Sequence, residues 1–205
     1  MRTVTLQSIL LRAWQRVGND ASTIDAIPSG ARTMMTAAAN ERISDCWEWA
    51  DWPELMRVES RTVQGDATNG YYIDYEQSGQ TAMGEVFGVL RDNPATHAAP
   101  RAIGFTLLGD AIRFPEDTDL PTSVWVNFRV RPTEYSASNL SATVPAVIAK
   151  AVALMLTSDL LTEDGQLDKA LAMEQLAESE LISQRDKYYF QQGQPSMWTA
   201  RVNQY

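Results

Sequence analysis

The feature that most constrains the fold is a change of pattern along the chain, from helical periodicity to short strand-like segments and back. Between residues 55 and 131, glycine and proline recur every several residues, and the segments between them favour valine, isoleucine, phenylalanine and tyrosine. This pattern predicts a series of short strands, at Leu55–Val63, Tyr71–Tyr75, Val86–Leu90, Ile103–Leu108, Ala111–Phe114 and Val124–Val130. Gly109-Asp110 lies between two apolar runs and predicts a tight hairpin over Phe105–Phe114.

Helical periodicity precedes this region. Apolar residues recur at helical spacing from Leu6 to Val17, with Thr3 or Thr5 as the expected N-cap and Gly18 as the stop. A second helix is expected from near Pro28 to about Trp49, because proline is tolerated in a first helical turn.

Helical periodicity also follows it. Residues 145–162 are apolar around most of the helix circumference and predict a central buried helix, and residues 166–190 predict a longer, charge-laced helix. The last fifteen residues, QQGQPSMWTARVNQY, contain no acidic side chain and are expected to form an extended arm.

The predicted fold class is α+β: an antiparallel helical bundle of about four helices with an inserted antiparallel β subdomain and an extended C-terminal arm. The expected domains are a bundle of residues 1–54 and 141–190, a β subdomain of residues 55–140, and an arm of residues 191–205.

Composition excludes several classes of function. A single cysteine, Cys46, excludes an intramolecular disulfide and a multi-cysteine metal site, and a single histidine, His97, excludes any mechanism that needs two histidines. The net charge of −9 argues against conventional nucleic-acid binding, which needs a clustered basic face. No apolar run approaches the roughly 20 residues of a membrane span, and the N-terminus lacks a signal-peptide pattern, so we expect a protein assembled inside a cell.

Two charged clusters in the β region are candidate sites. Glu116, Asp117 and Asp119 could bind Ca²⁺ or Mg²⁺ weakly, form a solvated turn, or meet cations of a neighbouring subunit. Arg129 and Arg131 lie at the end of a predicted strand. Two interpretations are equally compatible with them: a contact with a subunit or with DNA, or intrachain pairing with local carboxylates.

The C-terminal arm is a further candidate. Met197, Trp198 and Tyr205 are costly to leave in water on a segment that has no core of its own. The preferred interpretation is a docking peptide that buries Trp198 on a partner, and the alternative is a terminus that frays into disorder.

The element order, helix–helix–strands–helix–helix–arm, resembles that of the head-to-tail adaptor (connector) proteins of tailed bacteriophages, including the tail tubular protein A group. The similar segments are WEWADW, GEVFGVLRDNP, the GDAIRFP hairpin, VWVNFRVRPTEY and VPAVIAKAVALMLTSDLLTEDGQLDKA. The resemblance implies a non-enzymatic virion protein without cofactor or metal. It implies a ring of about twelve copies below the portal, which joins capsid to tail and extends the channel for double-stranded DNA without sequence-specific binding.

The resemblance also implies partners for the candidate residues. The arm, with Met197, Trp198, Arg201 and Tyr205, is expected to dock on the portal protein. Neighbouring subunits and tail or nozzle proteins are the expected contacts of Glu116, Asp117, Asp119, Arg129 and Arg131. Two alternatives stay open: a tail-terminator or other neck protein, and a hydrolase that holds a metal between carboxylates such as Glu116 and Asp119.

Overall fold

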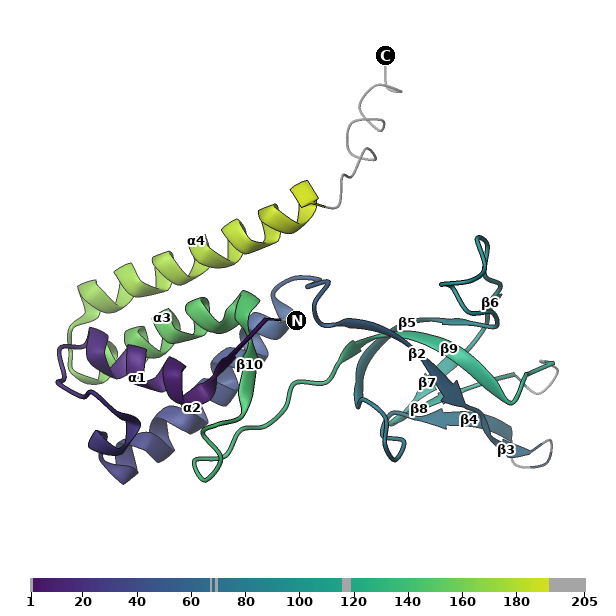
Figure 1. Cartoon of the computed structure of the whole chain (residues 1–205), viewed down its shortest axis with the longest axis horizontal. Helices are drawn as coiled ribbons and strands as arrows, with labels where there is room; N and C mark the ends of the chain where they lie inside the picture. The colour runs from purple at the N-terminus through teal and green to yellow at the C-terminus, as the bar shows by residue number, and fades with distance from the viewer. Residues whose placement is uncertain (1, 67, 69, 116–118, 192–205) are drawn as a thin grey trace, which may run out of the picture. The chain divides into compact units, whose positions relative to one another are not determined.

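The protein is described by a computed structural model that covers residues 2–66, 68, 70–115 and 119–191, the last three by their backbone alone. The chain forms two compact units (Figure 1). The helical unit consists of Met1–Glu54 together with the chain from Thr133 onward, and the β unit consists of Leu55–Pro132. The β unit is thus an insertion between the second and third helices.

In its described residues, the helical unit is built from four α-helices, a short 3₁₀ helix and a two-stranded ribbon. Its elements are β1 (Thr3–Thr5), α1 (Leu6–Arg16), η1 (Ile24–Ala26), α2 (Ser29–Glu48), β10 (Thr143–Pro145), α3 (Ala146–Glu163) and α4 (Leu167–Gln191). Thr5 is the N-cap of α1, and its hydroxyl oxygen accepts a hydrogen bond from the Ser8 amide. Gly18 follows the helix with a φ of 89°, a conformation that favours glycine, so the predicted start and stop of the first helix are confirmed.

The ribbon of β1 and β10 fixes where α1 and α3 begin. The two strands pair antiparallel, with Val4 opposite Val144. The first amides of α1 cannot find partners within the helix, and those of Leu6 and Gln7 donate instead to the carbonyls of Ala142 and Leu140. Segments more than a hundred residues apart in the chain are thereby joined next to the starts of two helices.

The central helix of this unit is α3, as its apolar circumference predicts. Eleven of its 18 residues are buried. The last helix, α4, runs antiparallel to α3. Two contacts show this: the Ser158 hydroxyl donates to the Ala170 carbonyl (2.8 Å), and Lys150 pairs with Glu180. This antiparallel pair places the start of α4 next to the end of α3.

The part of the β unit that the structure describes forms two four-stranded sheets. Strands β2 (Met56–Thr62), β9 (Ser123–Val130), β5 (Met83–Leu90) and β6 (Ala102–Ile103) form one sheet in that order. Strands β3 (Gln64–Asp66), β4 (Gly70–Asp74), β8 (Ala111–Arg113) and β7 (Thr106–Leu108) form the other, and all pairs are antiparallel. The predicted hairpin is confirmed as β7–β8, and Gly109 has the positive φ of 60° that a tight turn requires at its first central position.

The core of the β unit comes from alternate residues of these strands. Val124, Val126 and Phe128 of β9 are fully buried, whereas Trp125, Asn127 and Arg129 point to the other face of the sheet. The guanidinium group of Arg61 is buried with them, 4.9 Å from the centre of the Phe128 ring, and donates to Glu59 and to the Thr81 carbonyl. The sheet therefore buries one charged group, which is satisfied in part by an ion pair and an aromatic face.

The chain returns to the helical unit at Thr133, eight residues earlier than the predicted boundary at 141. The reason is Tyr135, which is buried in the helical unit and exchanges two hydrogen bonds with the Asn40 side chain (2.8 and 2.9 Å). Its hydroxyl also donates to the Thr143 carbonyl. The local sequence around Tyr135 does not predict these contacts, because the partner, Asn40, lies 95 residues away in the chain.

The predicted fold class, α+β, is confirmed, with four α-helices and antiparallel sheets. The predicted strand Ile103–Leu108 is instead split into β6 and β7, which belong to different sheets. Three strands of three residues each, β1, β3 and β10, were not predicted. None of the helices that the structure describes is both long enough and apolar enough to cross a membrane.

Candidate functional site

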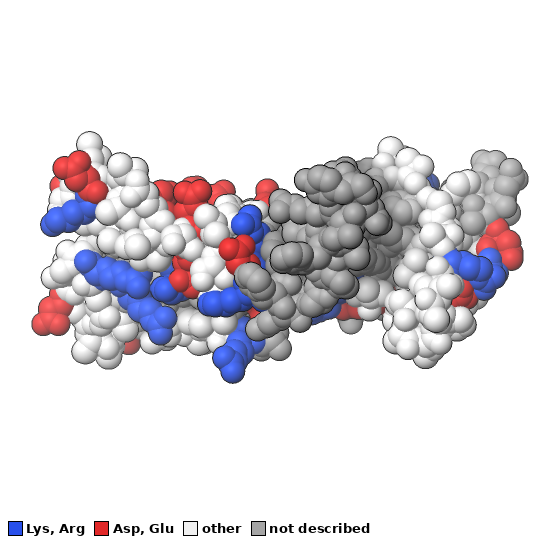
Figure 2. All heavy atoms as spheres, turned by 90° about the horizontal axis from the view of Figure 1, so that it is seen from above, with Lys and Arg blue, Asp and Glu red and all other residues white. Residues whose placement is uncertain are grey.

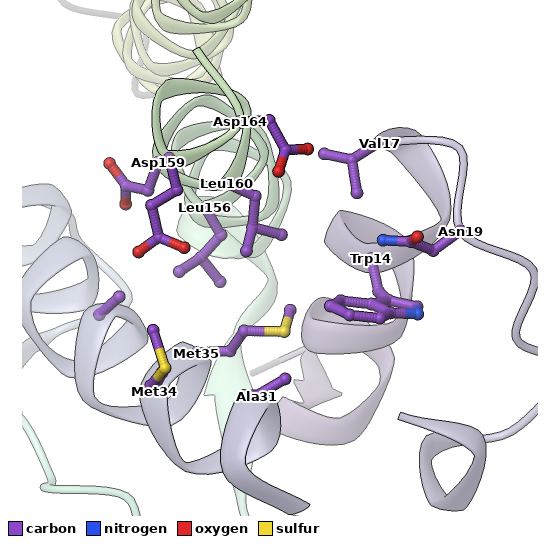
Figure 3. Close-up of a pocket in the computed structure, with 12 residues that line it drawn as sticks. Trp14, Val17, Asn19, Ala31, Met34, Met35, Leu156, Asp159, Leu160 and Asp164 are labelled. Carbon is purple, nitrogen blue, oxygen red and sulfur yellow. The ribbon is translucent and has the colours of Figure 1, made fainter. Parts of the chain in front are cut away.

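A hollow of about 300 Å³ lies in the helical unit, where the end of α1, the first half of α2 and the last turns of α3 face one another (Figure 3). Its apolar lining consists of Trp14, Val17, Ala31, Met34, Met35, Ala38, Leu156 and Leu160. Met35 and Leu156 are buried, whereas Met34 is 59% exposed, so the hollow is open to solvent on one side. Ligand sites in proteins usually span roughly 300–1,000 Å³, and this one suits one large side chain better than an extended cofactor. Methionine side chains adapt readily to an incoming group.

The edge of the hollow is acidic. Asp159, Glu163 and Asp164 of α3 and its C-cap line it, and no basic residue lies in the last turn of this helix. The carbonyl groups at a helix C-terminus carry a partial negative charge, so carboxylates are unfavourable there. Glu163 and Asp164 are exposed and form no ion pair with any residue that the structure describes. The site combines an apolar interior with an uncompensated negative edge, an environment that favours an apolar group accompanied by a cation.

The third carboxylate, Asp159, is already neutralised. The Arg42 guanidinium of α2 donates to both of its oxygens (3.0 and 2.5 Å) and lies 3.2 Å from Glu174 of α4. The hydrogen bonds to Asp159 raise the pKa of Arg42 above its usual value, although partial burial opposes this. Arg42 therefore joins three helices beside the hollow, whereas Glu163 and Asp164 have no cationic partner among the residues that the structure describes.

Charge over the rest of the helical unit is mixed. On the face that Figure 2 shows, acidic (red) and basic (blue) side chains lie interspersed over this unit.

The two arginines predicted as contact residues both pair within the chain. Arg129 is largely buried, 3.5 Å from Glu85, and its guanidinium lies 5.7 Å from the centre of the Phe87 ring. Arg131 reaches Glu76 (2.6 Å) and Asp110 (3.7 Å). The structure thus shows the intrachain pairing, and a role of these residues in subunit contacts stays a prediction.

The acidic cluster is described only in part. Asp119 is exposed, and its carboxylate lies 3.0 Å from the Arg91 guanidinium, which also donates to the Asp119 carbonyl. Glu116 and Asp117 lie outside the described residues, as do the arm residues Met197, Trp198, Arg201 and Tyr205.

Metal-binding and nucleophilic chemistry find little support in the described part of the chain. No group of three or more His, Cys, Asp or Glu side chains is arranged there to hold a metal ion. Burial raises the pKa of the Cys46 thiol to about 12, which disfavours the reactive thiolate. His97 is exposed, and its Nδ1 contacts the Thr96 hydroxyl.

The residues of the hollow were not predicted as a site. Trp14, Met34 and Met35 fit helical stripes, and a stripe carries no information on how completely neighbouring helices cover it. One signal was present: an otherwise apolar helix ends in Thr-Glu-Asp-Gly, without the lysine or arginine that a helix C-terminus favours.

No protein-family model matches this sequence, and a comparison with curated proteins gives no match.

Proposed function

We propose that this chain is a head-to-tail adaptor of a tailed bacteriophage, a structural protein that forms a ring below the portal and joins the capsid to the tail. The observation that supports the proposal most is the architecture: a helical unit interrupted between α2 and α3 by a β unit and completed by the long helix α4. This is the element order on which the resemblance to the connector family rests. No catalytic constellation has to be assumed for such a role.

Exposed apolar side chains support an assembled state. Leu167 and Leu171 of α4 are 64% and 61% exposed and lie one helical turn apart on the same face. Leu107 and Leu108 at the tip of the β7–β8 hairpin are likewise exposed. Adjacent exposed leucines mark surfaces that partner proteins cover, and a ring provides neighbours on two sides of every copy.

The overall charge suits a wall that DNA passes. Twelve copies at −9 each carry about −108 before screening by salt. A negative wall repels the phosphate backbone, so DNA slides past during packaging and ejection and does not adhere.

The test is electron microscopy of the purified chain mixed with purified portal protein. We expect one ring on the lower face of each portal, with the rotational symmetry of the portal. Sixfold rings on tail-tube protein, without portal binding, would favour the tail-terminator alternative. Failure to bind portal under all assembly conditions would refute the connector proposal.

A further inference from the structure

The helical unit has two dissimilar ends. The hollow lies at one end, beside the end of α3 and the start of α4. From there α4 runs for 25 residues to Gln191, which corresponds to about 37 Å of helix. Gln191, the last residue of α4, therefore lies at the end of the helix remote from the hollow.

The sequence of this segment complements the hollow. Residues 192–205 include Met197 and Trp198, a single cation at Arg201, and no aspartate or glutamate. The hollow offers an apolar interior of a size suited to one large side chain, and its edge carries the carboxylates of Glu163 and Asp164, which pair with no residue that the structure describes. An aromatic residue followed three positions later by arginine matches both features.

We propose that the hollow of one copy receives the C-terminal segment of an adjacent copy, with Trp198 in the apolar interior and Arg201 against Glu163 and Asp164. A copy cannot fill its own hollow in this way. The lining residues Leu156 and Leu160 flank Ser158, whose hydroxyl bonds to the Ala170 carbonyl, and Ala170 lies 21 residues before Gln191, about 31 Å of helix. Trp198 follows Gln191 by seven residues, which extend over at most about 24 Å. The contact is therefore head-to-tail between copies, and such a contact closes into a ring when the rotation between copies permits.

This contact would explain why α3 ends in two carboxylates. Glu163 and Asp164 oppose the helix dipole and have no compensating ion pair among the described residues. A local arrangement that costs stability is typical of a surface used for binding. The inference rests on the proposed ring, because the ring is what places one copy beside the next.

The test uses a fluorescent peptide of residues 191–205 and, as receptor, the full chain with Trp198→Ala, which leaves the hollow free. We expect saturable binding in fluorescence anisotropy. Ala31→Phe in the receptor places a ring in the hollow and should weaken binding at least tenfold. Ala37→Phe, on the same helix but exposed and outside the hollow, should leave it unchanged.

A charge reversal tests the edge separately and remains informative if Ala31→Phe fails to fold. Glu163→Lys in the receptor should weaken binding several-fold at low salt, and a peptide with Arg201→Glu should recover the loss on that receptor. Equal binding to the Ala31→Phe and Ala37→Phe receptors would overturn the proposal, as would Glu163→Lys without effect.

Three further outcomes separate this inference from the proposed function. If the peptide binds purified portal and not the chain, the segment is a portal anchor, as the sequence resemblance implies, and the hollow is not its receptor. If Ala31→Phe chains form normal rings on the portal, the connector proposal stands and the docking proposal falls. If the peptide binds the hollow but the chain never binds portal, docking stands and the connector proposal falls.

Discussion

Replacing Glu163 by lysine should stabilise the helical unit, although the same change is expected to weaken docking. Glu163 is exposed in the last turn of α3, beside Asp159 and Asp164, where a negative charge opposes the helix dipole. Removing one unfavourable charge and adding a favourable one contributes roughly 0.3–1 kcal/mol each in the best cases. Exposure to solvent reduces this, so we expect a gain of about 0.5–1 kcal/mol.

For a chain of this length, that gain corresponds to a rise in Tm of roughly 1–4 °C, measured by circular dichroism at 222 nm. The matched control is Glu178→Lys, which makes the same change of net charge at an exposed position in the middle of α4. The stabilisation should exceed that of the control at low salt and shrink toward it at 1 M salt, where screening acts over about 3 Å. A lower Tm, or a gain equal to that of the control at low salt, would contradict the account of the α3 terminus.

Three further changes test the fold. Arg42→Met should lower the free energy of unfolding of the helical unit by about 2–3 kcal/mol in urea titration, because it leaves Asp159 and Glu174 without their cation. The control is Arg32→Met, whose side chain has nearly the same exposure but whose partner is far more exposed, and it should cost under about 1 kcal/mol. Equal losses of stability in the two variants would argue against the Arg42 network. Phe128→Ala should lower the free energy of unfolding of the β unit by about 3–5 kcal/mol. In hydrogen exchange it should remove amide protection from the β unit, whereas α3 should keep its protection. Loss of protection in both would show that the two units unfold together. Burial raises the pKa of Cys46 to about 12, so its proton is bound more tightly in the folded than in the unfolded state. The stability that this contributes should be full below about pH 8.5 and fall as the pH rises above it. Cys46→Ala should flatten this decline between about pH 8 and 10, and an unchanged slope would refute the raised pKa of Cys46.

The sequence predicts those parts of the fold that depend on local pattern. Thr5 and Gly18 limit the first helix, and the apolar circumference of residues 145–162 identifies the central helix, because capping and periodicity are properties of neighbouring residues. The β7–β8 hairpin follows from Gly109-Asp110 for the same reason.

The parts that were missed depend on distant partners. Strands β1 and β10 have three residues each, too few for an alternating pattern, and they exist because they pair with each other. Tyr135 joins the helical unit through Asn40, and the hollow forms where three helices fail to cover Trp14 and Met34 completely. Arg42 is another example, since nothing in its neighbourhood along the chain indicates Asp159 as its partner.

The most direct test of the central claim is the structure of the chain bound to purified portal by electron microscopy, with the copies in the ring counted. We expect a ring of about twelve copies, matched to the portal, in which density from one copy enters the hollow between α1, α2 and α3 of the next. A chain that stays off the portal, or that assembles only as sixfold rings on tail tubes, would contradict it.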